Sequence, residues 1–247
     1  MQLIVALIAA AAGVWFLKTS WCPVIRQAIR QLPDGGQIRR QQLTWNSASP
    51  VLLAENRFLA IGVDLDGSSP GRSVADLRVQ FQKDQIKICS LLGCVALQFP
   101  EGWVVAFDRT SLEPWWGARE FAILAAAGAA SVIWLMLSWA ALATAYFVLV
   151  YVIGYVSDRD VTWSRSWRVA AAALMPGALG LTVGIVLYGL QALSLVGLLI
   201  VFLLHFVIGW SYVGLTPFFL RRASAVPPPG QNPFAAPGET PDRKNDQ

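Results

Sequence analysis

The sequence predicts an α-helical membrane protein with about four transmembrane helices and a small extracytoplasmic insert domain that is antiparallel and β-rich (α+β). Of the 247 residues, 55% are hydrophobic and only 14% are charged, whereas soluble domains average about 25% charged residues. Charges are frequent between Lys18 and Glu120, but they are absent from residues 121–157 and 169–220. This uneven distribution indicates lipid-facing segments around one soluble insert.

The first predicted span is an anchor helix over residues 1–22. Its apolar run, residues 3–17, is shorter than the roughly 20 residues that a spanning helix needs. Lys18 can extend its amine to the interface, and Trp21 can lie within it. A cleaved signal peptide is the alternative, but no Lys or Arg precedes the run and bulky residues follow its alanines. We therefore expect an uncleaved anchor.

Residues 23–118 form the predicted insert. A short amphipathic helix over residues 23–32 is ended by Pro33 and the glycines that follow it. Two strand-like segments come next, at residues 38–45 and 58–65, and in the second the apolar residues alternate with smaller or polar ones. We expect these strands or the helix to cover one face of a larger sheet.

That sheet is a predicted four-stranded antiparallel meander. Turns at residues 83–84, 90–93 and 100–102 keep apolar side chains on one face, and a slip of one residue at any turn would break this arrangement. The pairs expected on the apolar face include Phe81 with Ile86, Ile88 with Val95, and Leu97 with Val105.

The same register places Cys89 directly opposite Cys94. Opposed strand positions bring Cβ atoms about 4.5–5.5 Å apart, which a disulfide can bridge with slight adjustment. An oxidising compartment outside the cytoplasm would permit the bond. The alternative is that all three cysteines, Cys22 included, are unpaired and partly buried.

An N-terminal span, an extracytoplasmic β insert and C-terminal spans together resemble a bacterial family of unknown function. That family includes a membrane protein provisionally linked to maltodextrin utilisation. Leu-Pro-Asp-Gly at residues 32–35, Val-Asp-Leu-Asp-Gly at 63–67 and the hairpin at 76–88 carry the resemblance. Where the family has an aspartate–threonine pair, this chain has Asp64 followed by Leu65. The resemblance implies this architecture, and with it a multi-pass protein of the bacterial inner membrane, but no activity.

Residues 119–156 are predicted to form one long transmembrane helix with an interfacial extension. The uncharged part alone, residues 121–156, would be about 54 Å long as a single helix, against a hydrocarbon core of about 30 Å. Two helices are the alternative, but no turn residue interrupts the centre of the segment.

Residues 169–220 are predicted to form a transmembrane hairpin that turns at residues 189–194. Arginines flank both of its ends, at positions 159, 165 and 168 and at positions 221 and 222. The positive-inside rule makes that side cytoplasmic, so residues 157–168 are a cytoplasmic loop and the insert lies outside. The Pro-rich tail, residues 221–247, is predicted to be disordered and cytoplasmic.

Three residues of the hairpin are candidates for a special role. Pro176 removes a helix hydrogen bond and is expected to kink its helix. His205, the single histidine, lies within a predicted span, so a proton relay or ion path is one hypothesis. The alternative is a neutral imidazole that is hydrogen-bonded to a neighbouring helix, with Thr182 as the expected partner.

The sequence offers no catalytic, cofactor-binding or metal site. It has no His–Cys cluster for zinc and no glycine-rich phosphate loop, and its net charge of +4 is not gathered into a basic face for nucleic acid. The expected partners are the lipid bilayer and other membrane or extracytoplasmic proteins. We therefore predict a non-enzymatic protein whose outer domain serves binding, sensing or complex assembly; the alternative is a component of a transporter or channel built on the C-terminal spans.

Overall fold

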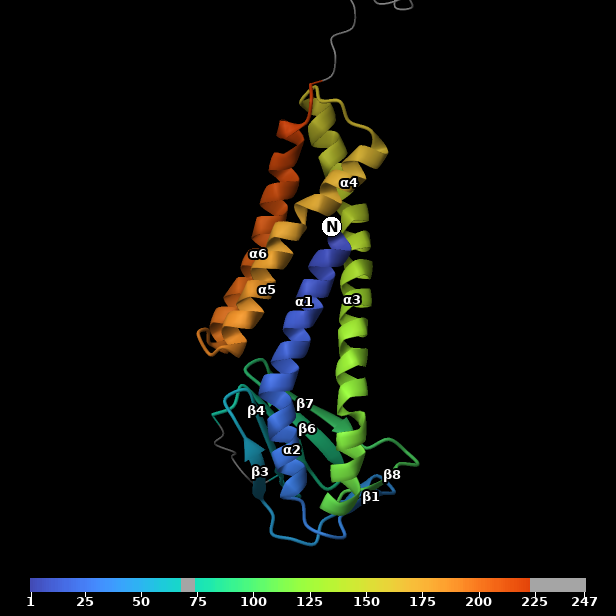
Figure 1. The fold of residues 1–247 in the computed structure, drawn as a ribbon, viewed down its shortest axis with the longest axis vertical. Helices are drawn as coiled ribbons and strands as arrows, with labels where there is room; N and C mark the ends of the chain where they lie inside the picture. Colours follow the sequence, from blue (N-terminus) through green and yellow to red (C-terminus); the bar gives the residue numbers. More distant parts are fainter. Residues whose placement is uncertain (68–73, 223–247) are drawn as a thin grey trace, which may run out of the picture.

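Four helices that are long and apolar enough to cross a membrane extend from a β-rich domain at one end of the molecule (Figure 1). The computed structural model describes residues 1–67 and 74–222. The predicted tail from residue 223 onward and residues 68–73 of the predicted insert lie outside the described residues. By length and composition, the candidate spans are Gln2–Arg30, Arg109–Val156, Trp163–Gly189 and Leu195–Phe219.

The first span continues without interruption into the β-rich domain. Helix α1 (Gln2–Phe16) passes through a π-helical turn at Leu17–Trp21 into helix α2 (Cys22–Arg30). The predicted amphipathic helix is therefore present, but it is a continuation of the anchor, and residue 22 is not a helix end. Pro23 is tolerated because it lies in the first turn of α2. In the π-helical turn, the Ser20 carbonyl accepts a hydrogen bond of 2.6 Å from Asn56 Nδ2.

The domain contains two sheets. A three-stranded sheet has the order β2-β1-β8, and a five-stranded sheet has the order β3-β4-β5-β6-β7. The strands are β1 (Gln37–Arg39), β2 (Gln42–Thr44), β3 (Val51–Glu55), β4 (Leu59–Val63), β5 (Leu77–Phe81), β6 (Gln85–Ser90), β7 (Gly93–Gln98) and β8 (Val104–Ala106). The prediction of an antiparallel domain needs correction, because β4 and β5 pair in parallel while the other pairs are antiparallel.

Two of the three predicted hairpins are confirmed residue by residue. Phe81 pairs with Ile86, Ile88 pairs with Val95, and Cys89 pairs with Cys94. The third is wrong, because Val105 pairs with Ile38 of β1 and not with Leu97. Phe99 is 1% exposed, so the chain turns into the domain core directly after β7 and carries β8 to the other sheet. Among the described residues, β7 is consequently an edge strand.

The early part of the domain differs from the prediction as well. Residues 38–45 form two short strands, because Arg40 and Gln41 both have positive φ angles and turn the chain back on itself. Strand β3 was not predicted. The core joins side chains from α2, both sheets and the segments that flank β8. Its large members that are at most 3% exposed are Val24, Ile38, Leu53, Leu59, Val63 and Phe99.

Helix α3 (Arg109–Val156) is one continuous helix of 48 residues, about 72 Å long. It begins at residue 109, not at the predicted 119, because Asp108 is an N-cap whose carboxylate accepts a hydrogen bond of 2.8 Å from the Ser111 N–H. Leu112, in the first turn of α3, packs against the core of the β-rich domain. Bidentate hydrogen bonds of 2.8 and 2.5 Å from Arg26 to Glu120 hold α2 beside α3.

The last two spans form a helical hairpin. Its helices are α4 (Trp163–Ala173), α5 (Met175–Gly189) and α6 (Leu195–Leu215), followed by a 3₁₀ turn at Thr216–Phe219. The predicted loop at residues 157–168 is shorter than expected, because Thr162 caps α4 at its N-terminus. The helix is interrupted at Leu174, between α4 and α5 and two residues before Pro176. Proline has no N–H and cannot continue the hydrogen-bonding pattern of a helix.

The segments that carry the flanking arginines, namely the α3–α4 connection with the start of α4 and the residues after α6, lie at the end of the bundle opposite the β-rich domain (Figure 1). There the Arg159 guanidinium donates a hydrogen bond of 2.8 Å to the Leu220 carbonyl, and the Asp160 N–H donates one of 2.9 Å to the Arg221 carbonyl. Both ends of the hairpin are thus joined at one end of the molecule.

Candidate functional site

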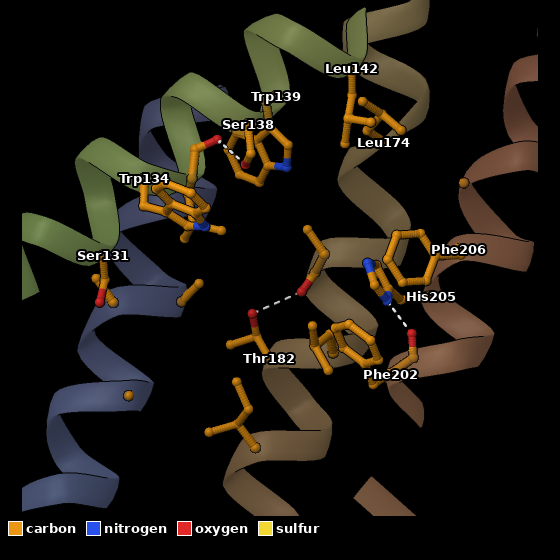
Figure 2. Close-up of a pocket in the computed structure, with 18 of the residues that line it drawn as sticks. Ser131, Trp134, Ser138, Trp139, Leu142, Leu174, Thr182, Phe202, His205 and Phe206 are labelled. Carbon is orange, nitrogen blue, oxygen red and sulfur yellow. Dashed lines mark hydrogen bonds between the residues drawn. The ribbon is translucent and has the colours of Figure 1, made fainter. Parts of the chain in front are cut away.

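A cavity of about 470 Å³ lies between the four candidate spans (Figure 2). Helix α1 contributes small residues, including Ala9 and Gly13, and α3 contributes Trp134 and Trp139. Helices α5 and α6 complete the wall with apolar and aromatic side chains such as Leu181, Ile185, Phe202 and Phe206. The volume falls within the range of roughly 300–1,000 Å³ that is typical of ligand sites.

Close helix contacts surround the cavity. A Cβ atom on Gly177 would lie 2.6 Å from the His205 carbonyl oxygen, so α5 and α6 touch through their backbones at this level. Near the α4 end of the bundle, Trp210 Nε1 donates a hydrogen bond of 2.7 Å to the Tyr146 hydroxyl and joins α6 to α3. Trp134 lines the cavity but is 73% exposed, so the cavity opens on the side of the bundle.

The serine and threonine hydroxyl groups around the cavity are satisfied within their own helices. Each donates to a main-chain carbonyl three or four residues earlier, at 2.8 to 2.9 Å: Ser131 to Ala127, Ser138 to Leu135, and Thr182 to Ala178. Of the residues that line the cavity, none is Asp, Glu, Lys or Arg. The described lining is therefore mostly apolar, and its polar groups include the His205 imidazole and the Tyr146 hydroxyl.

The predicted hydrogen bond between His205 and Thr182 is wrong, although both residues line the cavity (Figure 2). His205 Nδ1 is hydrogen-bonded to the Phe202 carbonyl of its own helix, and the imidazole packs on Phe206 with ring centroids 3.9 Å apart. Thr182 is 6% exposed and donates to Ala178. A hydroxyl or imidazole can reach a carbonyl one turn back in its own helix, so neither side chain needs a partner across the bundle.

A set of contacts, which we call the junction, attaches the β-rich domain to the turn between α5 and α6. Arg57 donates hydrogen bonds of 3.1 and 3.0 Å to the carbonyls of Gln191 and Leu193. The Tyr188 hydroxyl donates one of 2.7 Å to the Asp76 carboxylate. The Asp76 N–H in turn donates to the Arg57 carbonyl at 2.9 Å, so the two polar contacts are linked.

Aromatic rings reinforce the junction. Phe16 of α1, Phe58 of the domain and Tyr188 of α5 pack together with ring centroids 4.9 to 5.4 Å apart. Charge–dipole attraction favours an arginine beside carbonyls at the end of a helix. The junction therefore joins α1, α5 and the domain at one point.

The β6–β7 hairpin carries the predicted cysteine pair. In the structure Cys89 and Cys94 form a disulfide across the paired strands, and Cys22 is a free, buried thiol. The turn beyond the disulfide contains Leu91 and Leu92, which are 61% and 84% exposed. Among the described residues, no group of three or more His, Cys, Asp or Glu side chains could hold a metal ion.

Sequence reasoning missed the junction and the cavity. Arg57 and Gln191 are 134 positions apart in the chain, and no local pattern indicates that an arginine in a strand–strand loop will reach a helical turn. Trp134 is visible in the sequence as an aromatic residue within an apolar run, but aromatic residues are common in spans and do not indicate a cavity. The chain matches no protein-family model, no curated protein and no solved structure, so the resemblance to the bacterial family stays a prediction.

Proposed function

We propose that the protein crosses the bacterial inner membrane four times, with the β-rich domain outside the cytoplasm. Four apolar helices of sufficient length support this. The arginines at the end opposite the domain support the orientation, because basic residues favour the cytoplasmic side.

Within that membrane, we propose a non-enzymatic role in which the bundle binds the hydrocarbon chain of a lipid and the outer domain senses its presence. The observation that carries this proposal is the apolar cavity of about 470 Å³ walled by all four spans. Its opening on the side of the bundle would face the acyl chains of the bilayer. A chain that enters from lipid leaves one apolar environment for another, so close packing against the aromatic walls supplies the attraction.

A transport or channel function for ions has less support from this site. An ion would need ligands to replace its hydration shell, but the serine and threonine hydroxyls of the cavity already donate to their own helices. No Asp, Glu, Lys or Arg side chain is among the residues that line the cavity. A hydrocarbon chain needs no polar or charged ligand in order to bind.

Helix α5 provides the physical connection from the cavity to the outer domain. Leu181, Thr182 and Ile185 line the cavity, and Tyr188 lies one turn further along the same helix, in the junction. A shift of α5 that accommodates an occupant would therefore act directly on the Tyr188–Asp76 and Arg57 contacts. This arrangement favours sensing over passive lipid packing.

Photolabelling with matched variants tests the proposal. The full chain is placed in nanodiscs that contain a phospholipid with a photoactivatable diazirine on its acyl chain, and labelled peptides are identified by mass spectrometry. Ala9→Phe fills the cavity from α1, whereas Ala11→Phe places the same ring on the exposed side of that helix. We expect the first variant to lose labelling of the α5 peptide around Thr182 and the second to keep it. Equal labelling in both variants would refute a chain bound in the cavity.

A further inference from the structure

The tip of the β6–β7 hairpin is apolar to an unusual degree for a loop of a water-exposed domain. Its turn, Ser90 to Gly93, presents Leu91 and Leu92 at 61% and 84% exposure. No charged residue occurs between Ile88 and Pro100. Monomeric soluble domains seldom leave such neighbouring apolar side chains in water, and where they do, the patch commonly marks an interaction site.

This tip lies next to the end of the α5–α6 hairpin. A second cavity, of about 360 Å³, is walled on one side by Ser90, Leu91 and Leu92 and on the other by α5 and α6. Its helical wall consists of Leu181, Ile185, Leu195, Leu198, Leu199 and Phe202. Leu181 lies about two turns inside Gly189, the last residue of α5. The two leucines therefore face a wall of apolar side chains that extends about two turns into the hairpin.

From this position we propose that Leu91 and Leu92 insert into the hydrocarbon region of the outer leaflet and anchor the outer domain there. The inference rests on the membrane orientation proposed above. We assign the bilayer as the partner of the tip. The second cavity, between the tip and the hairpin, is bounded by side chains of the two candidate spans of that hairpin, and lipid must surround these spans. Transfer of two exposed leucine side chains from water into hydrocarbon is favourable, because it removes apolar surface from water.

The hairpin is built to enter an apolar medium. Its backbone groups must be satisfied there without water; Ser90 pairs with Gly93 across the turn, and the Leu92 N–H donates to Ser90 Oγ at 3.3 Å. Gly93 has a φ of +123°, which L-residues rarely adopt. The Cys89–Cys94 disulfide closes the turn immediately behind the tip, so the tip cannot open when its environment changes.

The second cavity adjoins the main cavity. Leu181, Ile185 and Phe202 line both cavities, so the inserted tip would lie against α5 and α6 side chains that also wall the space between the four spans. The outer domain would thus meet the helices that wall the main cavity at two places, the tip and the junction.

Site-directed spin labelling in nanodiscs tests the insertion. In a Cys22→Ser background with the Cys89–Cys94 disulfide intact, a nitroxide is attached to Leu92→Cys or, as the control, to Val104→Cys, which replaces a residue that is 70% exposed on β8. We expect the label at position 92 to collide more with oxygen than with a water-soluble nickel chelate, and the label at 104 to show the opposite preference. Mass spectrometry verifies that the native disulfide remains.

Equal nickel accessibility at positions 92 and 104 would overturn the inserted tip. A second variant, Leu91→Ser with Leu92→Ser, guards against a local effect of the label: we expect a probe at residue 90 to move toward water in this variant. If that probe is already in water in the wild-type tip, the proposal fails. These readouts do not depend on labelling of the cavity peptides, so failure of insertion and failure of lipid binding can be told apart.

Discussion

The β-rich domain and the helical bundle differ in the size of most of the side chains that they bury. The domain buries large residues, among them Leu53, Leu59 and Phe99, each at most 3% exposed. The bundle buries many small ones, including Ala6, Ala143 and Ala170, each 0% exposed, beside a few large ones such as Trp139 at 6%. Large apolar side chains of the bundle instead face outward, as Trp134 at 73% and Leu203 at 57% illustrate.

The difference shows which solvent each region is built for. In water, large apolar side chains move inside because their burial removes apolar surface from the solvent. In lipid that driving force is absent between helices, and close backbone approach through small residues takes its place. The distribution of side-chain size therefore agrees with the proposed membrane orientation, and the following changes test it from the largest expected effect to the smallest.

The largest effect is expected from Phe99→Ala. Phe99 is 1% exposed at the point where the chain leaves β7 for the domain core, and truncation of a buried phenylalanine costs about 3–5 kcal/mol. We expect faster pulse proteolysis of the domain in the full chain in nanodiscs. Val104→Ala, at a position that is 70% exposed, serves as the control, and an equal response of both variants would contradict the assigned core.

In the bundle, Gly177→Ala and Gly180→Ala should change the stability in opposite directions. A Cβ at residue 177 would lie 2.6 Å from the His205 carbonyl oxygen, whereas nothing lies within 4 Å of one at residue 180. Overpacking of this kind costs about 1–3 kcal/mol, while alanine at an open helical site is favourable by roughly 0.5–1 kcal/mol. Thermal unfolding in detergent micelles should show a lower midpoint for the first variant only. An equal decrease of the midpoint in Gly180→Ala would show that the close contact of α5 and α6 is not the cause of the lower midpoint in Gly177→Ala.

The junction should contribute a smaller, pairwise energy. We expect Tyr188→Phe and Asp76→Ala to be non-additive by about 1 kcal/mol, because each removes the same 2.7 Å hydrogen bond. The thermal midpoints of the two single variants and the double variant give the coupling. Strict additivity would mean that the hydroxyl and the carboxylate do not interact.

The smallest effect concerns acid sensitivity where the two regions meet. Hydrogen bonds from the Thr110 hydroxyl and then the Ser111 N–H lower the pKa of the Asp108 carboxyl. Because the folded pKa lies below the unfolded one, its contribution to stability is present above the unfolded pKa and is lost as the pH falls through the folded pKa. Asp108→Asn, which keeps a neutral cap, should flatten this acid dependence of the melting midpoint. An unchanged pH profile would rule out the ionised cap.

Much of the fold could be predicted because its signals are local. The alternation of apolar residues from Leu77 to Leu97 determines which face each strand buries, and short turns determine the register, so the β5–β6 and β6–β7 pairs and the opposed cysteines followed from the sequence. The start of α3 could also have been found, since Asp108 precedes Thr110 and Ser111 in a pattern typical of a helix N-terminus.

By itself, the sequence determined where the apolar helices lie and where basic residues flank them, because span length and charge are properties of continuous segments. Tertiary structure alone decided that β8 pairs with β1, that β4 runs parallel to β5, and that Arg57 reaches the turn after α5. Each of these choices depends on competition between surfaces far apart in the chain. The cavity has the same origin. Residues of all four candidate spans line it, so its presence cannot be predicted from the sequence of any single helix.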